Sequence, residues 1–115
     1  MAKKKARWMQ RADTAFSKVV REVGYCESDR ETHKGVLQCA HIIGRSYKTI
    51  RVDRRNALCL CAGCHMYFTH HPLEWRQWID ETRPGLWAEL NAEALAYAAV
   101  DWKSESVYWE SQVIQ

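Results

Sequence analysis

The sequence predicts a small α+β domain in which two short strands are flanked by helices on both sides. Three observations lead to this prediction. Apolar residues recur at helical spacing over residues 8–23, short apolar runs at 36–43 and 57–61 have the length of strands, and residues 86–102 are rich in Ala, Leu and Glu. A chain of 115 residues is long enough for one domain and too short for two.

The first helix is expected over residues 8–23, with one apolar stripe that faces the core. Gly24 suits the position just after the helix, because glycine readily adopts the left-handed conformation found there. Residues 27–35 are polar and show no periodicity, so we expect a loop or a tight metal-binding turn. The stripe consists of Trp8, Ala12, Phe16, Val19, Val20 and Val23.

A buried strand is expected over residues 36–43, between Gly35 and Gly44. Because side chains alternate along a strand, Cys39 and His41 should point to the same face. Further along the chain we expect a basic loop at 45–56, a short strand at 57–61, and helices at 65–71, 73–82 and 86–102. The tail to residue 115 carries no clear pattern.

Composition excludes several classes of protein. With 47% hydrophobic and 27% charged residues, the chain is neither disordered nor collagen-like. No apolar run approaches the roughly 20 residues that a membrane span needs, and the first residues lack the apolar core of a secretory signal. We therefore expect a soluble intracellular protein, organised as a single domain over 1–115 with a basic arm and helix at 1–25, a core at 26–72 and C-terminal helices at 73–115.

Charge is distributed unevenly along the chain. Residues 1–55 carry 14 Lys and Arg against 6 Asp and Glu, whereas residues 56–115 carry 3 against 8. Clustered basic residues neutralise phosphates, so the first half is expected to dock on nucleic acid. The N-terminal arm contributes Lys3, Lys4, Lys5, Arg7 and Arg11 to this charge.

Cysteine spacing predicts a structural zinc site. Cys61 and Cys64 are separated by two residues, the spacing by which a knuckle offers two thiolates to one tetrahedral Zn²⁺. Cys26 is the expected third ligand. The fourth ligand is Asp29, His33 or Cys39, with Asp29 slightly favoured. The odd total of five cysteines suits metal binding better than a disulfide framework.

One further pattern accompanies the knuckle. His41 is followed by Asn56, which lies five residues before Cys61, and His65 directly follows Cys64. This order resembles the HNH endonuclease family. The string from Cys39 to Arg45, followed by Arg51-Val52-Asp53, is most similar to the branch found in phages, some members of which act on recombination intermediates. The resemblance covers about residues 14–80.

The resemblance implies a ββα-metal finger that cleaves DNA with one divalent cation, either Mg²⁺, Mn²⁺, Ni²⁺ or Zn²⁺. In this chain His41 would be the general base that activates water, and a neutral imidazole suits that task. Asn56 would brace the hairpin loop, and His65 would ligate the cation. Arg45 and Arg51 would hold the phosphate. The expected DNA contacts are Arg45, Lys48, Arg51, Arg54 and Arg55.

The chain departs from the family pattern at Ala40, where many members carry an acidic residue or His that helps to hold the cation. His70 is five residues after His65 and therefore points to another side of the helix, so we expect His70 and His71 to be exposed or to face DNA. Asp53 is expected to cap a loop. The tryptophans are expected in the core; they are Trp75, Trp78 and Trp87.

Two other functions remain open from the sequence. The chain could be a zinc-containing DNA-binding module without catalysis, with Ala40 marking a lost cation site, or an adaptor that uses its acidic C-terminal helices. A homodimer is also open, through the Ala-rich face of residues 88–100. A phage-encoded enzyme would work in the cytoplasm of a bacterial host.

Overall fold

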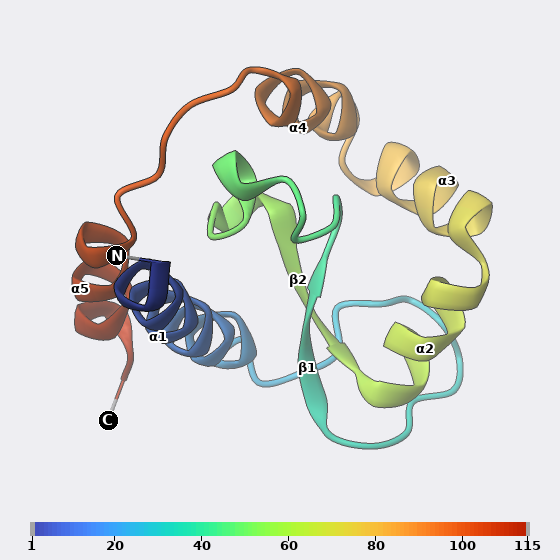
Figure 1. The fold of residues 1–115 in the computed structure, drawn as a ribbon. Coiled ribbons are helices and arrows are strands. Elements are labelled where there is room, and N and C mark those ends of the chain that lie inside the picture. The colour runs from blue at the N-terminus through green and yellow to red at the C-terminus, as the bar shows by residue number, and fades with distance from the viewer. Residues whose placement is uncertain (1, 115) are drawn as a thin grey trace.

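The computed structural model describes residues 2–114, and Figure 1 shows a two-stranded hairpin with helices on both of its faces. This confirms the α+β prediction. No helix among these residues is long and apolar enough to cross a membrane. In chain order the elements are α1 (Ala2–Arg21), β1 (Leu37–His41), the 3-10 turns η1 (Lys48–Ile50) and η2 (Arg54–Asn56), β2 (Ala57–Cys61), α2 (Ala62–His70), α3 (Pro72–Thr82), α4 (Leu86–Leu95) and α5 (Trp102–Gln112).

The two strands are antiparallel, and their register places Cys39 opposite Cys59 and His41 opposite Ala57. Because side chains alternate across a strand, the hairpin buries two different faces. Ala57 and Cys59 pack on one face with α1 and α5. Leu58 and Leu60 pack on the other with α2, α3 and α4. A sheet of only two strands is thus covered on both sides, which gives a small chain two cores.

The first core joins the two ends of the chain, as α1 and α5 lie side by side in Figure 1. The Phe16 ring meets the Trp109 ring edge-on at 4.9 Å, and both residues are buried. At the rim, Arg11 donates to the Glu110 carboxylate at 2.8 Å. The apolar stripe predicted for the first helix is therefore confirmed, because its residues pack in this core.

The second core contains the large aromatic residues of α2 and α3. Phe68, Trp75 and Trp78 pack with ring centroids 4.9 to 5.7 Å apart. The expectation that the tryptophans belong to the core holds for Trp78, which is buried, while Trp75 and Trp87 pack on its edge. The Arg76 guanidinium covers the exposed side of Trp87, 3.6 Å from the ring centroid.

The C-terminal helices differ from the sequence expectation. The helix expected over 86–102 ends at Leu95, and a second helix, α5, follows from Trp102. Asp101 starts α5 because its carboxylate accepts hydrogen bonds from the Ser104 backbone N–H at 3.1 Å and the Ser104 hydroxyl at 2.9 Å. Asp is a preferred residue at the position just before a helix, so Asp101 is a sequence signal for the start of α5.

Candidate functional site

A hollow of about 440 Å³ lies where α1, β1, the loop after β1 and α2 meet. His41 and His65, which lie 24 positions apart in the sequence, both line it, as does Arg45. The remaining lining residues are Asp13, Phe16, Ser17, Cys39 and Gly44. The structure therefore brings together three of the residues singled out by the sequence motif.

His41 ends β1 and is half-buried against the Phe16 ring. Its Nε2 lies 2.8 Å from the backbone carbonyl oxygen of Arg51. A carbonyl only accepts, so Nε2 carries the proton and Nδ1 carries the lone pair. Burial lowers the pKa of His41 and outweighs the hydrogen bond to Arg51, which acts in the opposite direction. The imidazole is thus neutral near pH 7, in a defined tautomer, with one nitrogen able to accept a proton.

His65 lies in the first turns of α2, next to the knuckle. Its Nδ1 donates to the Gln38 side-chain oxygen at 2.8 Å, which leaves the lone pair on Nε2. Burial lowers the pKa of His65. A neutral imidazole fixed through one nitrogen is the usual form of a histidine metal ligand. Gln38 therefore orients the His65 ring. Neither the motif nor the position of Gln38 in the predicted strand indicated this role.

Asn56 is fully buried between the two strands. Its side-chain oxygen accepts from the Ile43 N–H at 2.8 Å, and its amide donates to the carbonyls of Ile43 at 2.9 Å and Ile50 at 3.1 Å. The backbone oxygen of Asn56 also accepts from the Ile42 N–H at 2.8 Å. These bonds hold the loop that follows His41 against the start of β2, so Asn56 has the geometry of the brace that the resemblance implied.

Asp13 enters the hollow from α1 and was not indicated by the sequence. Its carboxylate accepts from Arg51 Nε at 2.9 Å and from the Arg51 terminal NH₂ at 2.6 Å. Arg51 also donates to the Arg45 carbonyl at 3.2 Å. Because the Arg51 carbonyl is the partner of His41, this ion pair fixes the segment that orients the histidine. The one weak sign in the sequence was the spacing of Asp13 and Ser17 on one side of the first helix.

Replacing Asp13 with asparagine should destabilise the fold by about 1–3 kcal/mol, since it leaves the partly buried Arg51 guanidinium without its charged partner. Urea unfolding of the zinc-loaded protein measures this loss. Asp80→Asn is the matched control, because Asp80 pairs with Arg76 on the exposed surface of α3, where such pairs contribute about 0.3–0.5 kcal/mol. Equal losses in the two variants would show that the Asp13 pair has no special role.

The predicted DNA-contacting residues fall into two groups. Arg45 and Lys48 are exposed, and neither side chain has a hydrogen-bond partner among residues 2–114. By contrast, Arg51 is engaged by Asp13, Arg54 donates to the Ala57 carbonyl at 2.8 Å, and Arg55 is surrounded by carboxylates. Those carboxylates belong to Asp53, Glu89 and Glu93. Arg51, Arg54 and Arg55 therefore hold the basic loop in place. Their guanidinium groups already have partners within the protein, whereas we expected them to be available for DNA phosphates.

A cluster of four possible metal ligands lies at the other end of the hairpin. Ligand atoms of Cys26, His33, Cys61 and Cys64 all lie within 4.8 Å of one another. His33 Nδ1 is 3.5 Å from Cys64 Sγ and 3.8 Å from Cys61 Sγ. Ligands at the usual bond lengths of tetrahedral zinc lie about 3.5–3.8 Å apart. The four residues thus have the chemistry and the spacing of a closed structural zinc site.

Electrostatics in this cluster favour a thiolate at Cys61, whereas burial raises the pKa of the Cys26 thiol to about 11. Burial opposes ionisation of Cys61, but hydrogen bonds from the Cys64 backbone N–H and from His33 outweigh it and lower the pKa of Cys61 to about 6. Arg30 donates to Cys64 Sγ at 3.4 Å. Zinc binds the deprotonated thiol, so these contacts prepare the cluster for a metal.

The fourth member of the cluster is His33 and not Asp29, the residue favoured from sequence. Asp29 is exposed and lines a different surface hollow with Arg30 and Tyr67. Cys39, the other alternative, lies in the hollow with His41, and burial raises the pKa of its thiol to about 11. The loop carries His33 back over the knuckle, as its neighbour Lys34 accepts through its carbonyl from the Gly63 N–H at 2.9 Å.

Four more residues discussed from the sequence can be placed. Ala40 is buried on the opposite face of the hairpin from His41, in the core with α2 and α3, so an acidic side chain here would not enter the hollow. His70 and His71 are exposed, as expected. His71 stacks on Tyr67 with ring centroids 4.0 Å apart. Asp53 caps η2 by accepting from the Arg55 N–H at 3.0 Å, which is the loop role predicted for it.

A family model described as HNH endonuclease matches residues 16–73, which is just over half of the chain. No curated protein and no solved structure has significant similarity to the chain. The matched segment contains His41, Asn56 and His65 and also all four members of the cysteine and histidine cluster. The geometry of the hollow and the family match agree, and the chain belongs to the HNH endonuclease family.

Proposed function

We propose that this protein is a metal-dependent endonuclease that hydrolyses phosphodiester bonds in DNA. Family membership supports a nuclease in general. The observation that carries the finer proposal is the meeting of two neutral imidazoles, His41 and His65, with the exposed Arg45 in one hollow. Each histidine is fixed through one nitrogen and presents the other.

His41 is the general base in this proposal. Its Nδ1 takes a proton from a water molecule, whose oxygen attacks the phosphorus as the bond to the leaving sugar oxygen breaks. The Arg51 carbonyl holds the ring through Nε2 and stabilises the imidazolium that forms. Arg45 contributes a guanidinium at the mouth of the hollow, where it would hold the phosphate oxygens.

His65 is the proposed ligand of the catalytic cation. His65 Nε2 carries a lone pair for such an ion, and the Asp13 carboxylate, which is paired with Arg51, lines the same hollow and keeps further lone pairs. A bound divalent cation would neutralise charge on the phosphate and on the leaving oxygen. Imidazole with water and phosphate oxygens accepts Mg²⁺, Mn²⁺, Ni²⁺ or Zn²⁺. The separate cluster of Cys26, His33, Cys61 and Cys64 is proposed to hold structural Zn²⁺.

The remaining proposals concern context. The phage-type branch and an intracellular location in a bacterial host rest on the sequence resemblance. A homodimer that would cut both strands rests on the Ala-rich face of residues 88–100. The division into a basic N-terminal part, a zinc-stapled core and C-terminal helices stays a prediction, because each of the two cores contains residues from more than one of these parts.

Supercoiled plasmid tests the proposal directly. The zinc-loaded protein is incubated with Mg²⁺, Mn²⁺ or Ni²⁺, and a lane with EDTA added immediately before the DNA reports dependence on the exchangeable cation. Conversion to nicked or linear DNA only with added cation is expected. DNA retardation without any cleavage, on plasmid and on a branched substrate alike, would contradict catalysis and favour a zinc-containing DNA-binding module.

The pH dependence of nicking should follow His41. Since burial lowers its pKa from 6.5, the neutral form predominates at and above pH 6.5, and the acid limb of the rate profile should lie below that value. Single-turnover nicking from pH 5 to 8 at fixed Mg²⁺ measures the midpoint. The exposed His70 provides a control, as His70→Ala should leave the profile unchanged. A midpoint above pH 7 would contradict a neutral base.

A further inference from the structure

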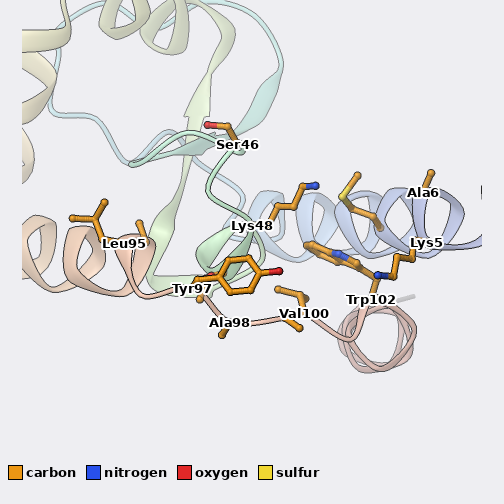
Figure 2. A pocket seen from close by; sticks show the side chains of 13 residues that line it. Lys5, Ala6, Ser46, Lys48, Leu95, Tyr97, Ala98, Val100 and Trp102 are labelled. Atoms are coloured by element: carbon orange, nitrogen blue, oxygen red, sulfur yellow. The ribbon is translucent and has the colours of Figure 1, made fainter. Parts of the chain in front are cut away.

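A second, larger hollow of about 690 Å³ lies beside the proposed active site. Figure 2 shows the rings of Tyr97 and Trp102 and the amino groups of Lys5 and Lys48 within it. Trp102 forms a buried floor, whereas Tyr97 is 95% exposed and stands out from the segment that joins α4 to α5. Leu95, which is 71% exposed, lines the same hollow, so the exposed apolar surface is contiguous and suits a ligand with a flat apolar face.

The two hollows follow one another along α1. Lys5 and Met9 line the larger hollow, and Asp13 and Ser17 continue the same ridge into the smaller one at intervals of four residues. On the facing loop, Arg45 lines the smaller hollow, and its neighbour Ser46 lines the larger. Lys5 and Asp13 are eight residues apart, about 12 Å along the helix, which is the length of a few nucleotides of a DNA strand.

The charged residues around the larger hollow favour an anionic ligand. No acidic residue lines the larger hollow, and its two cations, Lys5 and Lys48, have no side-chain partner among residues 2–114. On the other side of the α4 to α5 segment the surface becomes acidic, with Asp53, Asp101 and Glu105 around a smaller hollow. An anionic chain leaving Arg45 is therefore attracted towards Lys48 and repelled beyond Val100.

The ligand must present both phosphates and a free ring face. Within a duplex the bases are stacked on each other, so a paired base cannot lie flat on Tyr97. An unpaired nucleotide can, because aromatic side chains stack on bases of single-stranded nucleic acid while basic residues follow the backbone. The combination of two free lysines, an exposed tyrosine and an apolar floor matches that requirement.

We propose that the Tyr97 hollow binds an unpaired nucleotide of the DNA strand being cut, a few positions from the scissile phosphate. Lys48 and Lys5 contact the strand backbone, and Tyr97 stacks on the base. The preferred substrate class is accordingly DNA with single-stranded character next to the cleavage point, such as a fork or a flap. This inference rests on the proposed nuclease function for the placement of the strand in the hollow with His41.

Binding measurements separate this proposal from catalysis. The full zinc-loaded chain carrying His41→Ala binds, without cleavage, either a forked duplex with unpaired arms of both polarities or a fully paired duplex of equal length. Fluorescence anisotropy should show tighter binding of the fork. Adding Tyr97→Ala should weaken fork binding by roughly 5- to 100-fold and leave the paired duplex unchanged. Tyr97→Phe, which keeps the ring, should restore fork binding.

Two controls make the test specific. Tyr108→Ala removes another exposed tyrosine outside the hollow and should have no effect. Lys48→Ala should reduce the salt slope of fork binding by about 0.7, whereas Lys18→Ala, on a different side of α1, should not. Equal affinity of fork and duplex, or equal loss on both in Tyr97→Ala, would overturn the proposal. Wild-type chain that binds forks through Tyr97 but never nicks DNA would instead overturn the proposed function.

Discussion

Replacing His41 with alanine is expected to slow metal-dependent nicking by about 10²- to 10⁴-fold, the usual contribution of a general base. The reason is geometric as well as chemical. His41 Nε2 is held by the Arg51 carbonyl at 2.8 Å, so only Nδ1 can accept the proton of the attacking water. No other imidazole lies in the hollow apart from His65, whose nitrogens are used by Gln38 and by the proposed cation. Single-turnover nicking of plasmid measures the effect.

Alanine also removes a half-buried ring and leaves the Arg51 carbonyl without its partner, so a second variant is needed. His41→Gln can keep a hydrogen bond to that carbonyl but cannot act as a base, and it should be as slow as His41→Ala. Thermal unfolding verifies that both variants are folded. His70→Ala, which alters an exposed histidine on α2, should nick at the parental rate. Parental activity in a folded His41→Gln protein would exclude His41 as the base.

Removal of the proposed structural zinc should produce the largest effect on stability. Zinc binding to sites of this type is worth about 10–16 kcal/mol, whereas small domains are stable by only about 5–15 kcal/mol. The cluster joins the loop after α1 to the start of α2, through Cys26 and His33 on one side and Cys61 and Cys64 on the other. A strong chelator should therefore unfold most of the protein, as seen by circular dichroism, and added Zn²⁺ should restore it.

Substitutions identify the ligands. Cys64→Ala should reduce bound zinc, measured by elemental analysis, from one ion per chain to well below one. His33→Ala should weaken zinc retention, and Asp29→Ala should not, because Asp29 lies outside the cluster. Cys39→Ala is the matched thiol control, since Cys39 is half-buried but lines the other hollow. Full zinc content in Cys64→Ala, or loss of zinc in Asp29→Ala alone, would contradict the assignment of the four ligands.

The centre of the fold was predictable because its signals are local. The strand at residues 37–41 and the knuckle follow from apolar runs between glycines and from the spacing of Cys61 and Cys64. The motif of His41, Asn56 and His65 indicated which side chains would converge, and the structure places both histidines in one hollow. These signals do not depend on how distant parts of the chain pack.

The identity of the fourth member of the Cys and His cluster depends on a backbone conformation that residue spacing does not reveal. Gly35 has a φ of +85°, and a Cβ atom there would lie 2.9 Å from the Ala62 Cβ. The loop can therefore turn sharply and close onto the knuckle, which brings His33 to the cysteines while Asp29 remains outside. Spacing from Cys26 slightly favoured Asp29, whereas the conformation of this turn places His33 at the cluster.

The roles of the arginines depend on partners that are far away in the sequence. Arg51 is paired with Asp13, 38 residues earlier, and Arg55 with Glu93, 38 residues later. A basic loop viewed alone suggests five free cations, whereas packing leaves Arg45 and Lys48 without side-chain partners among residues 2–114. The helix α5 was missed for a related reason, since its stability comes from packing on α1 and not from strong intrinsic propensity.

The pairing of α1 with α5 also has a consequence for the order of folding. The ion pair between Arg11 and Glu110 closes a loop of 99 positions, whereas the zinc cluster and the core around α2 and α3 involve much closer parts of the chain. Long loops cost more entropy to close and form later. We expect the finger with its proposed zinc to form first and α5 to dock on α1 last. Since Trp109 of α5 packs on Phe16, which lines the hollow with His41, one wall of the proposed nuclease site would be completed only at that final step.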